Sequence, residues 1–145
     1  MPLLKLMKNT SGKFKDRFTF RKEERLCSKK LFDQLFANGT SFLVYPLKVL
    51  YVVAEHSGGY PVQAAFAASK KLFRKAVFRS LLKRRMREAY RLNKHILYHR
   101  AGDKKLVIIF IYVGKEIMDF HQIEKALKRA LNIITDNIFE SIPNP

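Results

Sequence analysis

Residues 106–113 read LVIIFIYV, an unbroken run of apolar and mostly β-branched or aromatic side chains. A strand with one face in water alternates apolar and polar residues, and this run has no polar face. It is also far shorter than the roughly 20 residues that a membrane-spanning helix needs. The run therefore predicts a central strand covered on most of both sides, and the rest of the chain has to supply that cover.

Further strands are predicted upstream of this run. Residues 47–54 (LKVLYVVA) and 62–69 (VQAAFAAS) are rich in strand-forming residues. The turn residues 57–61 (SGGYP) lie between them, so these two segments are predicted to form a hairpin. Residues 40–45 predict a short extra strand before Pro46.

The apolar residues of the remaining segments recur at helical spacing, which predicts three helices. Ser28 is the expected N-cap of a first helix, which ends at Asn38-Gly39 with Gly39 in the left-handed conformation. A second helix is predicted from residue 74 or 75 to about 98, and a last one over 119–139, with Asp119 as its N-cap. The order α-β-β-β-α-β-α predicts a single α+β sandwich.

The predicted domain organisation has three parts. Residues 1–19 form a flexible basic arm, residues 20–140 form the domain, and residues 141–145 form a tail. Phe18 and Phe20 are expected to pin the end of the arm to the domain. The arm lacks the apolar core and cleavage site of a signal peptide, so a cytoplasmic protein is expected. The single cysteine, Cys27, excludes an internal disulfide and a cysteine-based metal cluster.

The charge of the chain indicates its type of partner. With 29 basic and 12 acidic residues, the formal net charge is +17. Such an excess is normally balanced by a polyanion, with nucleic acid as the first candidate and an anionic membrane as the second. The absence of a long apolar run argues against a membrane.

Most of this charge gathers in residues 69–91, SKKLFRKAVFRSLLKRRMREAYR. On a wheel of 100° per residue, one side of the second helix carries Lys75, Arg79, Lys83, Lys94, Arg87, Arg91 and Arg84. The other side carries Phe78, Leu81, Leu82, Ala89, Leu92 and Ile96. Met86 and Tyr90 are exceptions that lie within or beside the basic sector, and Glu88 is the only acid. A face of one sign implies a bound polyanion, whereas a face kept for solubility alternates its signs.

Phe32 and Phe36 are four residues apart and share a face of the first helix. By spacing alone they are expected in the core, and a platform that stacks on unpaired bases is the functional alternative. His95 and His99 have the same spacing but no obvious third metal ligand. Acids are sparse, so neither a catalytic set nor a two-metal nuclease site is predicted.

Three stretches together resemble the protein subunit of bacterial ribonuclease P. They are residues 18–42, 67–94 and 105–112. The signature helix of that family reads R-N-R-x-K-R-x-x-R-E. After Lys75-Ala76, this sequence matches it with Arg79, Lys83, Arg84, Arg87 and Glu88. It departs from the signature at Ser80, where the family has Asn, and at Leu81, where it has Arg.

The resemblance implies a fold and a mechanism. The fold is an α-β sandwich similar to a domain of ribosomal protein S5, with a left-handed crossover around the basic helix. The RNA subunit is the catalyst, and it removes the 5′ leader of precursor tRNA with Mg²⁺ held mainly by RNA and substrate. No catalytic residue and no stably bound metal are expected in the protein.

The resemblance also implies two contact surfaces. The catalytic RNA is expected to contact Lys75, Arg79, Ser80, Lys83, Arg84, Arg87 and Arg91. A separate cleft for the single-stranded leader is expected to hold Phe32, Phe36, Tyr51, Lys70 and Lys71. The expected partners are ribonuclease P RNA and precursor tRNA, with no membrane and no obligate protein partner. A general RNA-binding or ribosome-associated protein with no role in cleavage stays open as the alternative. A DNA-binding helix is the weaker third, because nothing suggests a helix-turn-helix or a dimer.

Overall fold

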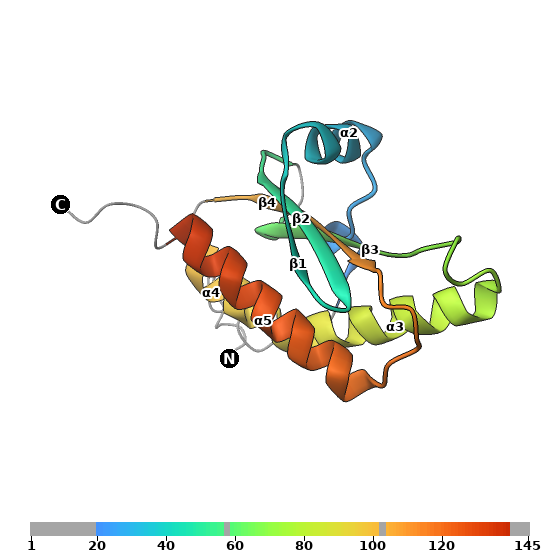
Figure 1. The fold of residues 1–145 in the computed structure, drawn as a ribbon. Coiled ribbons are helices and arrows are strands. Elements are labelled where there is room, and N and C mark those ends of the chain that lie inside the picture. Colours follow the sequence, from blue (N-terminus) through green and yellow to red (C-terminus); the bar gives the residue numbers. More distant parts are fainter. Residues whose placement is uncertain (1–19, 57–58, 102–103, 140–145) are drawn as a thin grey trace.

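The computed structural model describes residues 20–56, 59–101 and 104–139 (Figure 1). The predicted basic arm, with Phe18, and the predicted tail lie outside these ranges. The elements are η1 (Lys22–Glu24), α2 (Lys29–Asn38), β1 (Thr40–Val44), β2 (Leu47–Val53), β3 (Val62–Ala68), α3 (Ala76–Asn93), α4 (His95–Ala101), β4 (Leu106–Tyr112) and α5 (Phe120–Phe139). The α+β class and the predicted order are confirmed, with the second helix divided into α3 and α4. No helix within the described ranges is both long and apolar enough to cross a bilayer.

The four strands form one mixed sheet in the order β1-β2-β4-β3. β4 pairs antiparallel with β2 and parallel with β3, so the apolar run is a central strand, as predicted. The predicted hairpin between β2 and β3 is wrong, because β4 lies between them. β2 instead forms its hairpin with β1 across the cis Tyr45–Pro46 peptide bond. The hand of the crossover from β3 to β4 stays a prediction.

Helices cover the two faces of the sheet unequally (Figure 1). α3, α4 and α5 pack on one face, where the larger core includes Val49, Tyr90, Phe110 and Leu127. α2 alone crosses the other face, over a smaller cluster that includes Leu35, Val107 and Ile109. Because one ten-residue helix cannot cover four strands, part of this second face stays open.

Both predicted N-caps are confirmed. The Ser28 hydroxyl accepts the Leu31 N–H at 3.3 Å. Asp119 accepts the Gln122 N–H at 2.9 Å, and the Gln122 side chain accepts the Asp119 N–H at 3.3 Å. The left-handed conformation expected for Gly39 is wrong, because its φ is −73° and its ψ is 154°. Glycine is needed there because a Cβ would lie 2.3 Å from the Leu35 carbonyl oxygen.

A buried ion pair lies where α3 gives way to α4. Lys94, between the two helices, donates its ammonium to the Glu24 carboxylate, and both side chains are almost fully buried. The Tyr98 hydroxyl donates to the same carboxylate at 2.5 Å, and burial raises the pKa of Tyr98 well above its usual range. The wheel placed Lys94 on the basic face, and this placement is wrong because the ammonium is held inside the domain.

Phe20 packs against β3 and α3. Its ring makes edge contacts with Phe66 at 5.6 Å and with Tyr90 at 5.8 Å between centroids. The packing of Phe20 on the domain is therefore confirmed, whereas the arm that it is predicted to pin lies outside the described residues. The contact joins the first described residue to both β3 and α3.

Candidate nucleic-acid interface

The outer side of α3 is a polar and cationic surface that we call the basic face. Its members are Ser80, Lys83, Arg84, Arg87 and Arg91, and Lys75 is the N-cap residue just before the helix. Lys83 and Arg91 are half-buried and the others are exposed. The helix presents this side to solvent because its other sides pack on the sheet and on α5. The first turns of α3 project beyond the edge of the sheet (Figure 1), which leaves the start of the basic face open.

The boundary of the basic face in the structure differs from the one that the helical wheel predicts. Met86 and Tyr90, which the wheel placed in or beside the basic sector, are fully buried. Tyr90 packs on Phe66 and Phe110 with centroids 5.7 and 5.8 Å apart. The inner side of α3 is thus centred on Met86 and Tyr90. Leu81, which the wheel assigned to the apolar arc, is only half-buried.

Two arginines of α3 bind backbone carbonyls of neighbouring loops. Arg79 donates through Nη1 to the carbonyl oxygens of Phe73 and Arg74, both at 2.7 Å. Arg85 donates through Nη1 to the Met118 carbonyl oxygen at 2.5 Å. Arg79 was predicted as an RNA contact. The structure turns its guanidinium toward the loop before α3, which it fixes.

The one acid of α3 is already paired. Arg91 donates through Nε to Glu88 at 3.1 Å, with a second hydrogen bond between the same two groups. This hydrogen bonding lowers the pKa of the Glu88 carboxyl and raises the pKa of Arg91. Arg91 is the hydrogen-bonding partner of Glu88, and Arg84 and Arg87 stay exposed on the basic face.

The second surface is formed by α2 and the sheet residues beside it, where the leader cleft is predicted, and we call it the α2 groove. Phe36 is 57% exposed on α2, and Phe32 is half-buried beside the smaller cluster. The sheet contributes Leu50, Ala65, Ala67 and Ile111, which all pack partly buried against that cluster. An exposed aromatic ring beside an apolar strand surface is suited to stacking on unpaired bases.

Tyr51 does not reach the α2 groove. Successive residues of a strand point to opposite faces, and Tyr51 points to the face covered by α5. There it is only 6% exposed, packs on Phe42 and accepts a hydrogen bond from Asn137 at 3.2 Å. Leu50 and Val52 of β2 lie on the groove side, as does the exposed Lys48. The alternation of β2 could have indicated these residues, had the position of α2 been known.

Lys70 and Lys71 are exposed in the turn that follows β3. The turn is stabilised by Ser69, whose hydroxyl accepts the Leu72 N–H at 3.2 Å and whose carbonyl oxygen accepts the Phe73 N–H at 2.9 Å. β3 borders the α2 groove, and α3 begins a few residues after the turn. The two lysines therefore lie along the chain between the two surfaces.

No cluster of three or more His, Cys, Asp or Glu side chains able to hold a metal is found in the described ranges. His95 and His99 lie 5.7 Å apart between ring centroids, on α4, as their spacing predicts. Cys27 is an exposed thiol just before α2. The two surfaces described here present charged and apolar side chains.

Comparison with known proteins places the chain in a family. Residues 20–135 match the family model of Ribonuclease P. The ribonuclease P protein component of Porphyromonas gingivalis is 39% identical over 124 residues, covering 83% of this chain and 90% of that protein. The same component from Chlorobium phaeobacteroides is 34% identical over 128 residues, covering 80% of this chain and 88% of that one.

Solved structures agree with the fold. The RNase P protein of Thermotoga maritima superposes with a TM-score of 0.61 at 27% identity, covering 76% of this chain and 96% of that one. The Staphylococcus aureus RNase P protein has a TM-score of 0.61 at 23% identity, covering 80% of this chain and 97% of that one. The chain therefore belongs to the bacterial ribonuclease P protein family, as a component of the endoribonuclease of tRNA processing that works with ribonuclease P RNA.

Proposed function

We propose that the chain binds the catalytic RNA through the basic face of α3 and the 5′ leader of precursor tRNA through the α2 groove. It thereby assists removal of the leader to give the mature 5′ end. The observation that carries the proposal is the charge of the basic face, where Arg84 and Arg87 are exposed and the only acid is paired with Arg91. Cations of one sign along a helix are suited to a row of phosphates.

Two surfaces with different chemistry support two roles. The basic face offers charge, which positions an RNA backbone without reading bases. The α2 groove offers the exposed ring of Phe36 beside apolar strand residues, which suits single-stranded RNA whose bases are free to stack. Lys70 and Lys71, between them along the chain, are proposed to contact the phosphates of the leader.

The proposal places the chemistry on the RNA. Hydrolysis of the phosphodiester bond uses Mg²⁺ held mainly by RNA and substrate, with the protein adding binding energy and charge neutralisation. None of its residues is proposed to be catalytic. The complex is proposed to act in the cytoplasm, where a bacterium makes and processes tRNA.

Cleavage at low Mg²⁺ tests this function directly. The purified protein is added to a bacterial ribonuclease P RNA and a leader-bearing precursor tRNA, and the rate of leader release is measured. The protein should stimulate cleavage, because it neutralises phosphates that Mg²⁺ would otherwise screen. Binding without stimulation would instead support a general RNA-binding protein.

Replacing Phe36 tests the α2 groove separately. Phe36→Ala should weaken the affinity of the holoenzyme for leader-bearing precursor tRNA about fivefold or more, because one stacked aromatic is worth about 1–3 kcal/mol. The same variant should bind tRNA without a leader as the wild type does. Tyr51→Phe is the matched control, since Tyr51 lies on the other face of the sheet and should not affect either substrate. Equal losses with both substrates would contradict the role of the groove.

A further inference from the structure

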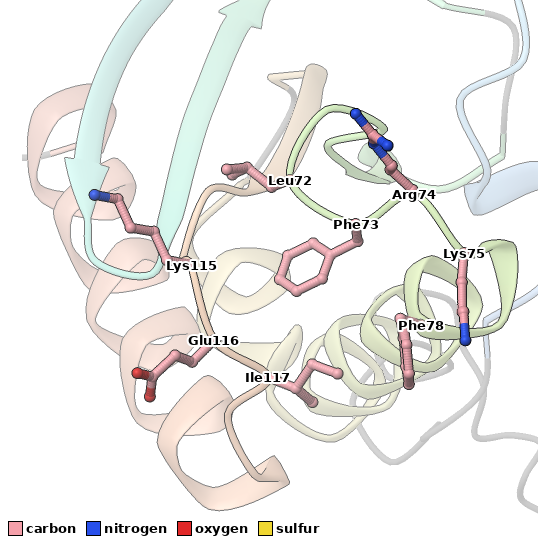
Figure 2. Close-up of a pocket in the computed structure, with 8 residues that line it drawn as sticks. All are labelled: Leu72, Phe73, Arg74, Lys75, Phe78, Lys115, Glu116 and Ile117. Atoms are coloured by element: carbon pink, nitrogen blue, oxygen red, sulfur yellow. The ribbon is translucent and has the colours of Figure 1, made fainter.

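A pocket of about 570 Å³ opens at the start of α3 (Figure 2). It lies between the turn after β3 and the connection from β4 to α5. Phe73 forms its floor, and Leu72, Phe78 and Ile117 form its walls. Its volume is within the roughly 300–1,000 Å³ of small-ligand pockets. It shares no residue with the α2 groove described above.

The walls of this pocket are unusually apolar for a surface in water. Leu72, Phe78 and Ile117 are 43%, 38% and 38% exposed. Single exposed apolar residues are normal, and these three are gathered around one concavity, where they form a small apolar surface that a flat ring could cover. In the part of the chain that the structure describes, these three are among only eight large apolar side chains with this degree of exposure.

Both loops that line the pocket are held by side chains from the domain. Arg79 fixes the first loop through the carbonyl oxygens of Phe73 and Arg74. Tyr112 fixes the second, because its hydroxyl donates to the Glu116 carbonyl oxygen at 2.5 Å and accepts the Met118 N–H at 3.0 Å. The ring of Phe73 packs edge-on against Tyr112 with centroids 5.8 Å apart, which joins the two loops. Because the two loops are already held in place, binding a ligand in this pocket costs little conformational entropy.

The positive charge around the pocket favours an anionic occupant. Arg74, Lys75 and Lys115 are exposed at the rim, and their charged ends point outward from the apolar centre (Figure 2). Glu116 is the only acid in the lining. A second copy of this chain, with a net charge of +17, would be repelled. Residues 1–19 would be opposed as well, because they carry five cations and one acid.

An RNA nucleotide combines the two properties that the pocket matches. Its base is flat and largely apolar on its faces, and its phosphates are anionic. Unpaired bases of folded RNA stack on aromatic side chains when they are splayed out of a helix. Lys75 lies at the pocket rim and is the N-cap residue of α3, so the pocket opens at the start of the helix that carries the basic face.

We propose that the pocket takes an unpaired nucleobase of the catalytic RNA, stacked on Phe78, with its flanking phosphates near Lys75 and Lys115. The inference rests on the proposed binding of α3 to that RNA and adds a base contact to what is otherwise a backbone contact. It makes Arg79 a positioning residue for the pocket.

Fluorescence gives a direct test, because the chain has no tryptophan. Phe78→Trp creates a single reporter inside the pocket, and Leu43→Trp creates one on β1, at a residue that is 62% exposed and lies outside both the pocket lining and the basic face. On addition of a bacterial ribonuclease P RNA, the Phe78→Trp emission should be quenched and shielded from acrylamide. The Leu43→Trp emission should change much less. Equal responses would overturn the inference.

Affinity gives an independent test with the full chain and the same RNA. Phe78→Ala should weaken binding about fivefold or more at fixed salt, while the dependence of affinity on salt stays unchanged because no charge is lost. Phe78→Tyr, which keeps the ring, should restore the affinity. Leu43→Ala removes a similarly exposed apolar side chain from β1 and should have no effect.

The outcomes separate this inference from the proposed function. If wild-type protein stimulates cleavage but Phe78→Ala binds the RNA as tightly, the pocket inference fails alone. If the wild type neither binds the RNA nor stimulates cleavage, both fail. A loss that appears only with leader-bearing precursor tRNA would overturn the assignment to the catalytic RNA. Thermal unfolding of Phe78→Ala checks that the variant is folded, as expected for a half-exposed residue.

Discussion

Glu24→Gln is expected to lower the free energy of unfolding by about 3–5 kcal/mol, because it leaves the buried ammonium of Lys94 without its counter-charge. A domain of this size is stable by only about 5–15 kcal/mol, so the loss is a large share of the total. The side chain keeps its shape, and the Tyr98 hydroxyl keeps an acceptor. Urea denaturation followed by circular dichroism measures the change.

Two controls separate the buried charge from charge in general. Glu24→Gln combined with Lys94→Met removes both members of the pair and should recover much of the lost stability. Asp33→Asn breaks the exposed pair with Lys29 and should cost less than about 1 kcal/mol. If the single and double changes at Glu24 and Lys94 were equally destabilising, the account of an uncompensated buried charge would be wrong.

Arg84→Ala combined with Arg87→Ala should weaken binding of the catalytic RNA roughly a hundredfold, at about tenfold for each charged hydrogen bond lost. The slope of log affinity against log salt should fall by about 1.5 to 2, because two fewer counterions are released. The loss should be the same whether or not the precursor tRNA carries a leader. Filter binding at several salt concentrations measures both quantities.

The matched control for this pair lies on α5. Lys128→Ala combined with Arg129→Ala removes the same charge from two exposed positions outside the basic face. Its effect on RNA binding should be small, because it changes only the long-range field of the protein. Similar losses in the two double variants would mean that the total charge, and not the basic face, determines the affinity.

Most of the elements could be predicted from sequence because their signals are local. The apolar run of β4, the N-cap of Ser28 and the N-cap of Asp119 each depend on a few neighbouring residues. The neighbours of each strand could not be predicted in the same way. β3 is predicted to pair with β2 because the two strands follow one another in the chain, whereas β4 lies between them in the sheet.

The errors at the site have a similar origin. Tyr51 and Leu50 are adjacent, and a shift of one residue in a strand exchanges the two faces of a sheet. Both residues are apolar enough for either face, so only the position of α2 distinguishes them. Lys94 was assigned to the basic face because its partner, Glu24, is 70 residues earlier in the chain. A wheel describes one helix and contains no information about such a partner.

The pair of Glu24 and Lys94 also has a geometric consequence. Glu24 lies just before the helix that borders the α2 groove, and Lys94 lies just after the helix that carries the basic face. Their contact ties the segment before the first of these helices to the end of the second. If α3 binds the catalytic RNA and α2 borders the leader, as proposed, the pair helps to set the distance between the catalytic RNA and the leader. Weakening the pair would then make the cleavage position on the precursor tRNA less accurate, with a smaller effect on the affinity for either RNA.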